Sequence, residues 1–242
     1  MIATAGLTSS RNFQRQPLHI FRNHPTQTPF AARPSPASTT TRGALLIMAS
    51  NRTALIPIAN GSEEMEAVIV ADVLRRAQVH VTIASIEKDK VTVECSRGVH
   101  IVADVLIEDC VHEEYDVVVL PGGMPGAEHL RDNKHVADIL SKQRASDKHI
   151  AAICAAPQVV LDSQGLLDGR KATAHPAFSD KLPNRESVEQ RVVSDGKVMT
   201  SRGPGTAFEF ALSLVKLLFD EAKAEEIAGP MVMYDGWKNS LV

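Results

Sequence analysis

Three side chains of this sequence could together carry out nucleophilic and proton-transfer chemistry. Cys154 lies in "HIAAICAAP", between an apolar run and a turn of small residues. Glu66 lies in "EEMEAVIV" and His175 in "ATAHPAF". A thiol becomes a nucleophile when its anion is stabilised, as at a helix N-terminus with free backbone N–H groups. The competing interpretation is that Cys154 is a small hydrophobic residue of the core.

Glu66 differs from the two acids that precede it. It shares a helical face with apolar residues three, four and seven positions further on, namely Ile69, Val70 and Val73. A carboxyl on that face is expected to be desolvated, to have a raised pKa, and to hold a proton near a thiolate. Glu63 and Glu64 are instead expected to be solvated acids that complement the helix dipole.

Backbone donors and cations provide weaker signals. Gly122 and Gly123 end an apolar run, where they form either a simple tight turn or a pair of N–H groups directed at an oxyanion. His175 follows a predicted strand and is either a base or a hydrogen-bonded core residue. Arg202, in "TSRGPGTAFEF", indicates anion binding beside a helix N-terminus, and Arg97 alone is a weak signal.

The elements that position these residues alternate between strand and helix. Strands are predicted at 53–59, 79–86, 90–95, 115–123 and 149–154, helices at 63–78, 156–167 and 206–220, and an Asp-Gly hairpin at 191–201. This order is typical of βαβ units and a largely parallel sheet in one α/β domain. Ligands of such sheets bind at the carboxyl ends of the strands. The turns "ANGSEE", "PGGMPG" and "CAAP" should therefore meet at one edge.

The N-terminal segment 1–47 differs in composition from the rest of the chain. It contains five arginines and no Asp, Glu or Lys, and the formal net charge of −3 divides into +5 over this segment and −8 over the remaining 195 residues. An arginine-rich, Ser/Thr-rich segment without acids is typical of a transit peptide, and its scattered prolines favour a plastid over a mitochondrial address. The alternatives are a disordered tail or a true start at Met48.

The rest of the composition argues against several classes of protein. No apolar run approaches the roughly 18 residues that a membrane span needs, and the acidic body argues against nucleic acid as the main partner. The three cysteines have no CxxC spacing and the nine histidines form no HExxH pattern, so neither a disulfide framework nor a metal site is expected.

Five segments in this order and spacing resemble the ThiJ/PfpI superfamily, in particular its Parkinsonism-associated deglycase (DJ-one) group and the plant glyoxalase III proteins. They are "ANGSEEMEAV", "VVVLPGGMPGAEHL", "AAICAAP", "KATAHP" and "TSRGPGTAFEFAL". The resemblance covers residues 48–232 and implies a flavodoxin-like three-layer α/β sandwich of the class I glutamine amidotransferase type. It also implies a homodimer that needs no cofactor. Residues 233–242 extend past the usual end of such proteins.

The resemblance also implies a role for each candidate residue. Cys154 matches the nucleophilic and redox-sensitive cysteine, and Glu66 matches the protonated acid beside it. The other matches are an oxyanion hole at Gly123 and Ala155, with Gly122 next to them, a pocket histidine at His175, and anion-binding arginines at Arg97 and Arg202.

Two functions follow as expectations. One is a cofactor-independent glyoxalase III, a lyase that converts methylglyoxal and glyoxal to D-lactate and glycolate, with repair of glycated groups as a related activity. The other is an oxidative-stress sensor or redox-regulated chaperone without significant turnover.

The protease-like branch has His directly after its nucleophile, whereas Ala155 stands here, which weakens a peptidase interpretation. Plant relatives often carry two tandem copies, so this single copy is expected to dimerise. The expected location is the chloroplast, with the cytoplasm or mitochondrion as alternatives.

Overall fold

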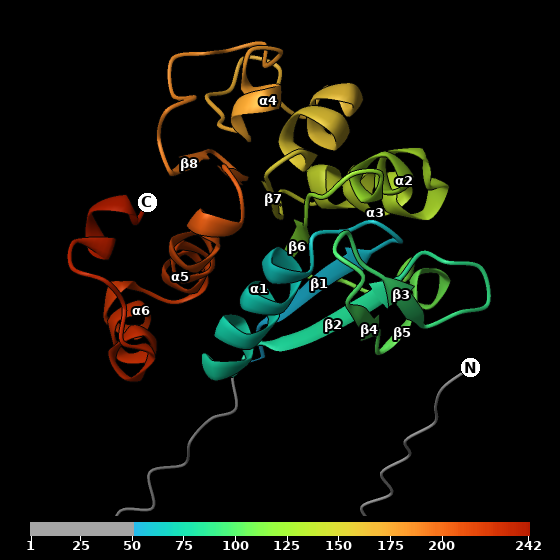
Figure 1. Ribbon diagram of the computed structural model, residues 1–242, viewed down its shortest axis with the longest axis horizontal. Coiled ribbons are helices and arrows are strands. Elements are labelled where there is room, and N and C mark those ends of the chain that lie inside the picture. The colour runs from blue at the N-terminus through green and yellow to red at the C-terminus, as the bar shows by residue number, and fades with distance from the viewer. Residues whose placement is uncertain (1–50) are drawn as a thin grey trace, which may run out of the picture. The chain divides into compact units, whose positions relative to one another are not determined.

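The computed structural model describes residues 51–242 (Figure 1). The segment 1–47, interpreted above as a transit peptide or tail, lies outside the described residues, and that interpretation stays a prediction. In the described part, no helix is both long and apolar enough to cross a membrane.

A seven-stranded sheet forms the centre of the fold. Its order is β5 (Val105–Leu106), β2 (His80–Ser85), β1 (Thr53–Ile58), β6 (Val117–Leu120), β7 (His149–Ile153), β9 (Val198–Ser201) and β8 (Val192–Asp195). All neighbours pair in parallel except β8 and β9, which form the predicted Asp-Gly hairpin. The prediction of a mostly parallel α/β sheet is therefore confirmed.

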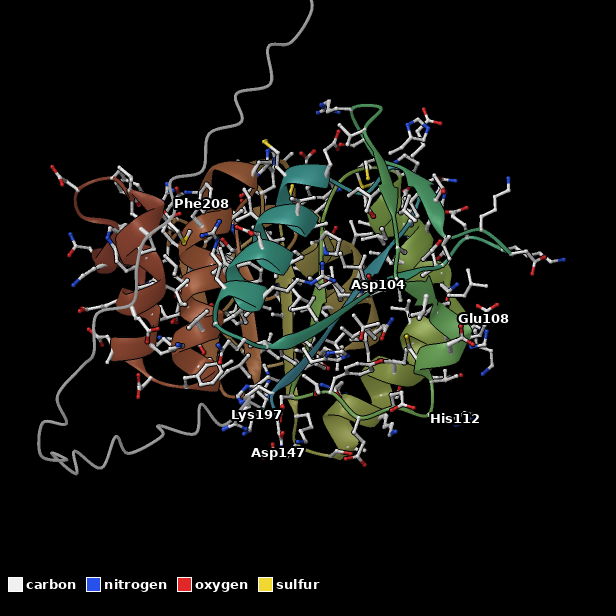
Figure 2. The ribbon with its side chains drawn as sticks, turned by 90° about the horizontal axis from the view of Figure 1, so that it is seen from below. Asp104, Glu108, His112, Asp147, Lys197 and Phe208 are labelled. Atoms are coloured by element: carbon white, nitrogen blue, oxygen red, sulfur yellow. The ribbon has the colours of Figure 1, made fainter. Side chains whose placement is uncertain are left out.

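The sheet is covered on both faces, and for that reason its central strands read as continuous apolar runs. Every residue of β6 is buried. One face packs against α1 (Glu64–Arg76), α5 (Ala207–Leu218) and α6 (Glu221–Ala228), and α1 and α5 lie side by side (Figure 2). The other face packs against α2 (Gly126–Asp132) and α3 (Lys134–Ala145). Alternate residues of β1 serve the two cores, with Ile56 on one side and Leu55 on the other.

Several elements differ from the sequence-based expectation. The strand expected at 90–95 is β3 (Thr92–Glu94), which pairs with β4 (His100–Val102) in a separate two-stranded sheet. The helix expected at 156–167 is a π-helical turn (Pro157–Leu161) followed by a 3-10 turn (Asp162–Gln164) that ends at Gly165, whose φ is +64°. A left-handed glycine ends the helix early because it satisfies the last carbonyls and turns the chain away.

The remaining elements are short. They are α4 (Pro176–Ser179) and 3-10 turns at Ile107–Cys110, Pro204–Thr206, Gly229–Met231 and Trp237–Ser240. Two of them border the site described next: α4 begins directly after His175, and the turn Pro204–Thr206 leads from β9 into α5.

Candidate active site

The three turns predicted to meet at the carboxyl edge of the sheet do so. The backbone N–H of Glu63, after β1, donates to the carbonyl of Gly122, after β6, at 3.0 Å. A Cβ built on Gly122 would lie 2.6 Å from the Cβ of Cys154, which follows β7. Neighbouring parallel strands thus bring three distant segments into contact.

Cys154 occupies a sharp elbow between β7 and the π-helical turn. Its φ is +66°, a left-handed conformation that is rare and strained for a residue other than glycine. Two backbone hydrogen bonds hold it there: Cys154 N–H donates to the Ser201 carbonyl at 3.0 Å, and His175 N–H donates to the Cys154 carbonyl at 2.8 Å. Because segments on both sides fix the elbow, the side chain is held toward the turns that surround it.

Glu66 is fully buried beside this cysteine, on the face of α1 that the sequence pattern indicated. Its Oε2 accepts a hydrogen bond from Gly122 N–H at 2.7 Å. The Cys154 side chain lies beside this carboxyl and lowers its pKa, while Oε1 is buried and has no hydrogen-bond partner among the described residues. Burial, only partly offset by these hydrogen bonds, raises the pKa of Glu66 to about 7. The carboxyl can therefore hold or release a proton near neutral pH.

The thiol of Cys154 is coupled to this carboxyl. Burial first, and the negative charge of Glu66 second, raise the pKa of Cys154 to about 12, while hydrogen bonds from the backbone of Gly123 and Ala155 lower it. The second cause disappears when Glu66 is protonated. The two groups therefore titrate as a pair that carries one negative charge far more readily than two.

The two glycines have different tasks. Gly123, with φ +83°, directs its N–H at Cys154, as does Ala155. The N–H of Gly122 is already used by Glu66, so its expected place in the oxyanion hole is wrong. Gly122 is needed for close approach instead, because a Cβ there would also lie 2.9 Å from the Ala155 nitrogen.

His175 does not follow a strand as expected, because residues 170–175 have no regular structure. It caps the N-terminus of α4, and its Nδ1 accepts a hydrogen bond from Ala177 N–H at 3.2 Å. This cap requires Nδ1 to be unprotonated, so in the neutral ring the proton is on Nε2. His175 is therefore arranged to donate a hydrogen bond rather than to act as a base.

A cavity of about 320 Å³ opens over the sulfur. It is lined by Glu63, Ser96, Arg97, Gly123, Met124, Cys154, Ala155, His175, Ala177, Phe178 and Pro204. Arg97 is thus at the cavity, as expected. Arg202 is not among its lining residues, because its guanidinium pairs with Glu189 at 3.0 Å. Of the two arginines expected around the mouth, Arg97 lines the cavity and Arg202 does not, and the anion-binding role of Arg97 stays a prediction.

The acids Glu63 and Glu64 also depart from expectation, because both are buried. Ser96 Oγ lies 2.8 Å from a Glu63 oxygen and 3.0 Å from a Glu64 oxygen, and Arg97 N–H donates to Glu64 at 3.0 Å. Burial raises the pKa of Glu64, but these hydrogen bonds, with those from its own backbone and from Val99, outweigh burial and lower it. The adjacent glutamates "EE" in a turn were the one feature of the sequence that could have indicated this acidic part of the site. Nothing in the sequence indicated that Ser96, Met124, Phe178 and Pro204 line the cavity.

The described residues 51–242 contain no group of three or more His, Cys, Asp or Glu side chains arranged to hold a metal ion.

Comparisons with known proteins agree with this geometry. Residues 52–217 match the model of the DJ-1/PfpI family. "Protein DJ-1 homolog B" of Arabidopsis thaliana is 45% identical over 185 residues, which cover 76% of this chain and 42% of that protein. "Glutathione-independent glyoxalase DJR-1.2" of Caenorhabditis elegans is 34% identical over 189 residues, which cover 77% of this chain and 99% of that protein.

Solved structures give the same result. "Toxoplasma gondii DJ-1, oxidized" superimposes with a TM-score of 0.73 at 46% identity, covering 75% of this chain and 98% of that one. The flavodoxin-like fold that the resemblance implied is thereby confirmed. This chain spans less than half the length of the Arabidopsis relatives that it matches. Taken together, the matched segment and the identities show that the chain belongs to the DJ-1/PfpI family.

Proposed function

We propose that this protein is a glutathione-independent glyoxalase that converts small α-oxoaldehydes such as methylglyoxal and glyoxal to hydroxy acids. One observation carries the proposal: Cys154, held at a left-handed elbow, opens to a cavity and lies beside a buried carboxyl whose pKa is about 7. The Caenorhabditis elegans relative named as a glutathione-independent glyoxalase supports it.

The first step is the attack of the Cys154 thiolate on the aldehyde carbon. A C–S bond forms, and the carbonyl π electrons move to oxygen, giving a hemithioacetal after protonation. The N–H groups of Gly123 and Ala155, which are directed at the Cys154 sulfur, would donate to the developing oxyanion. His175 is placed to donate from Nε2 to an oxygen of the substrate.

The second step moves a hydrogen between adjacent carbons. The Glu66 carboxylate removes the proton from the former aldehyde carbon, giving an enediol, and returns a proton to the neighbouring carbon. The aldehyde carbon is thereby oxidised to a thioester while the ketone is reduced to an alcohol, so no external redox partner is needed. Water then cleaves the thioester, which releases lactate and restores the thiol.

The test is to measure lactate formed by the full chain from methylglyoxal without glutathione. We expect turnover by the wild type and none by Cys154→Ser. Glu66→Gln should lower the rate by ~10²–10⁴-fold, the range for loss of general acid–base catalysis. Equal lactate formation by wild type and Cys154→Ser would show that the proposal is wrong.

Exposure of the thiols favours a second candidate function, a sensor of peroxide. Cys154 is partly exposed, whereas Cys95 and Cys110 are buried. Burial raises the pKa of all three thiols, so it is exposure and not the pKa that distinguishes Cys154. In this function peroxide is reduced to water as the Cys154 thiolate becomes sulfenic and then sulfinic acid, and a protonated Glu66 would donate to the sulfinate.

Intact mass after mild peroxide treatment tests this second function. A gain of two oxygens at Cys154 before the other two cysteines react supports it, and equal oxidation of all three contradicts it. The two functions are compatible, because oxidation of Cys154 would stop the enzyme.

A further inference from the structure

We propose that Tyr234, which lies outside the cavity, is a positioning residue for Cys154 and acts through Glu209 and Arg191 on the turn that borders the site. The expected effect on methylglyoxal turnover rests on the proposed function, whereas the expected effects on hydrogen exchange and on alkylation of Cys154 do not. Tyr234 belongs to residues 233–242, the extension for which sequence analysis found no role. We call Tyr234–Val242 the C-terminal strap.

The strap is fastened to the body of the domain along its length. Trp237 and Leu241 pack against the hydrophobic core that α5 and α6 share. The Lys238 ammonium pairs with Glu225 on α6 at 2.5 Å, and Val242 N–H donates to Ser213 Oγ on α5 at 3.4 Å. These contacts hold the later part of the strap against α5 and α6.

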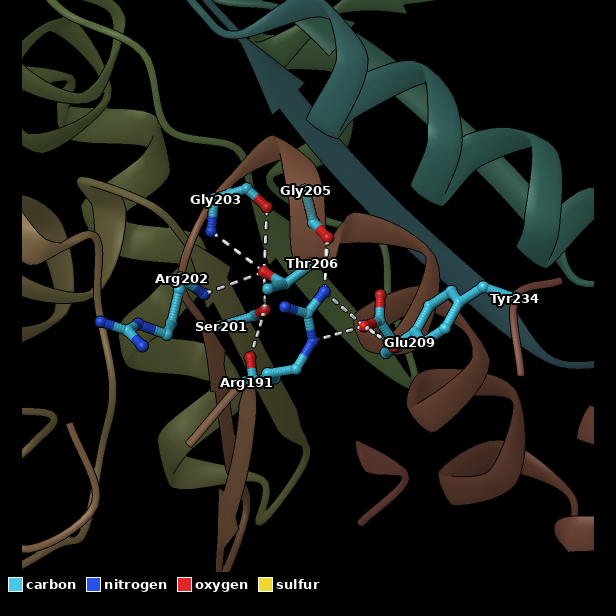
Figure 3. A network of polar contacts seen from close by, with 8 residues as sticks. All are labelled: Arg191, Ser201, Arg202, Gly203, Gly205, Thr206, Glu209 and Tyr234. Atoms are coloured by element: carbon cyan, nitrogen blue, oxygen red, sulfur yellow. Dashed lines mark hydrogen bonds and ion pairs between the residues drawn. The ribbon is translucent and has the colours of Figure 1, made fainter. Parts of the chain in front are cut away.

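Tyr234, at the start of the strap, contacts an ion pair between Arg191 and Glu209 in which the carboxylate is buried (Figure 3). Its hydroxyl donates to Glu209 Oε1 at 2.5 Å, and Arg191 Nε donates to the same oxygen at 2.6 Å. The Glu209 side chain is 1% exposed, and a carboxylate at such a site needs its hydrogen bonds satisfied. Burial and the Glu209 charge raise the pKa of Tyr234, so the phenol remains a donor at physiological pH.

Arg191 transmits this contact to the turn between β9 and α5. Its guanidinium donates to the Gly205 carbonyl at 2.6 Å, and its own carbonyl accepts from Ser201 Oγ at 2.8 Å. Ser201 Oγ is also 2.7 Å from Thr206 Oγ1, which lies within hydrogen-bond distance of Gly203 N and O, at 3.1 and 2.9 Å. Every step of this network runs between neighbours shown in Figure 3.

The network ends at the active site in two ways. The Ser201 carbonyl accepts the Cys154 N–H that holds the strained elbow, and Pro204, within the same turn, lines the cavity. A shift of this turn therefore changes both the backbone conformation of Cys154 and the part of the cavity wall that Pro204 forms. Removing the Tyr234 hydroxyl leaves the buried Glu209 carboxylate one donor short, and the turn is expected to loosen.

The experiment compares Tyr234→Phe with Lys238→Gln in the full chain. The two substitutions lie in the same strap, but the ammonium of Lys238 pairs with Glu225 on α6 and not with the turn. Native-state hydrogen exchange at the Cys154, Gly203 and Thr206 amides is the structural readout. We expect roughly 3- to 10-fold faster exchange in Tyr234→Phe and no change in Lys238→Gln. Iodoacetamide alkylation of Cys154 and kcat for methylglyoxal should fall over the same range, with KM changing less.

A double-mutant cycle tests the route. In a Glu209→Gln background, the added effect of Tyr234→Phe on exchange should be smaller than in the wild type, because both changes act on one contact. The proposal is overturned if the effects of Tyr234→Phe and Glu209→Gln on exchange are fully additive. It is also overturned if Tyr234→Phe leaves exchange unchanged, or if Lys238→Gln changes exchange as much as Tyr234→Phe does. Exchange and alkylation need no turnover, so they decide this proposal even if methylglyoxal is not a substrate. If Glu209→Gln does not fold, Arg191→Lys replaces it in the cycle.

Discussion

Cys154 and Glu66 form a pair in which each group sets the protonation of the other. The ionised carboxylate raises the pKa of the thiol, so the thiolate forms most easily when Glu66 carries the proton. In that state the sulfur anion has donors from Gly123, from Ala155 and from Glu66 itself. After attack on the substrate the sulfur is no longer charged, and Glu66 is free to ionise and serve as the base. This order of events is what the proposed reaction requires.

The raised pKa of Glu66 predicts how stability depends on pH. The folded-state pKa of about 7 lies above the ordinary glutamate value of 4.5, so the folded protein binds more protons than the unfolded chain between these two pH values. The stabilisation is fully present below about pH 4.5 and is lost as pH rises through 7. Glu66→Gln should remove this loss. Relative to the wild type, the variant should gain up to roughly 3 kcal/mol of unfolding free energy between pH 4 and pH 8.

Urea unfolding at a series of pH values provides the measurement. Glu108→Gln is the matched control, because Glu108 is an exposed glutamate that does not line the cavity. The same pH dependence in both variants would contradict the assignment of the raised pKa to Glu66.

At the scale of elements, the site depends on how closely the strand ends approach one another. Gly122 has its backbone against Cys154 and Ala155, and an added Cβ would lie 2.6 and 2.9 Å from their atoms. Gly122→Ala should therefore destabilise the fold by about 1–3 kcal/mol and slow Cys154 alkylation, because the elbow must move. Gly229→Ala, where an added Cβ meets nothing within 4 Å, should leave both unchanged. Thermal unfolding measures the change in stability, and iodoacetamide kinetics measure the rate of Cys154 alkylation. Equal stability and equal alkylation rates in the two variants would contradict the prediction.

The elements and the pair at the centre of the site could be predicted because their signals are local. The 3, 4 and 7 spacing after Glu66 identified its buried face, and β-branched runs identified the parallel strands. Contacts between distant segments could not be predicted. Ser96 approaches Glu63 from 33 residues away in sequence, in the turn between β3 and β4. A strand at 90–95 was predicted, but its pairing with β4 outside the main sheet was not. The contact with Ser96 turned expected surface acids into buried ones.

The same limit explains the two wrong binding assignments. The N–H of Gly122 is used by Glu66, which is 56 residues distant, and Arg202 turns to Glu189 rather than to the cavity. Neither partner could be read from the residues next to Gly122 or Arg202. Side-chain pairing across a fold is decided by tertiary packing, whereas propensity and spacing describe only the chain nearby.

At the scale of the whole molecule, α1 and α5 present apolar side chains to solvent at their first turns. Met65 and Val68, three residues apart on one face of α1, are 52% and 48% exposed. Phe208, at the start of α5 and labelled in Figure 2, is 42% exposed. Adjacent exposed apolar side chains on packed helices are typical of protein–protein interfaces. We propose that this surface joins two copies of the chain about a two-fold axis.

Sedimentation equilibrium tests the dimer. The wild type should show a mass of about twice the 26.2 kDa of one chain. Val68→Lys should shift it toward the monomer, because a two-fold interface would receive two ammonium groups at once. Val232→Lys, at an 89% exposed position outside this surface, should remain dimeric. A wild-type mass near that of one chain would overturn the prediction.

The last prediction concerns residues 1–47, which carry five arginines and no acid. Such a segment is too polar and too often interrupted by proline to bury a core of its own, and a transit receptor would read its composition rather than its fold. Deleting it should therefore leave the melting temperature and methylglyoxal turnover of residues 48–242 unchanged. Fusing residues 1–50 to a fluorescent protein should direct that protein into chloroplasts of a photosynthetic host. A mitochondrial signal would keep the transit function and change its address, whereas a diffuse cytosolic signal would leave only the tail interpretation.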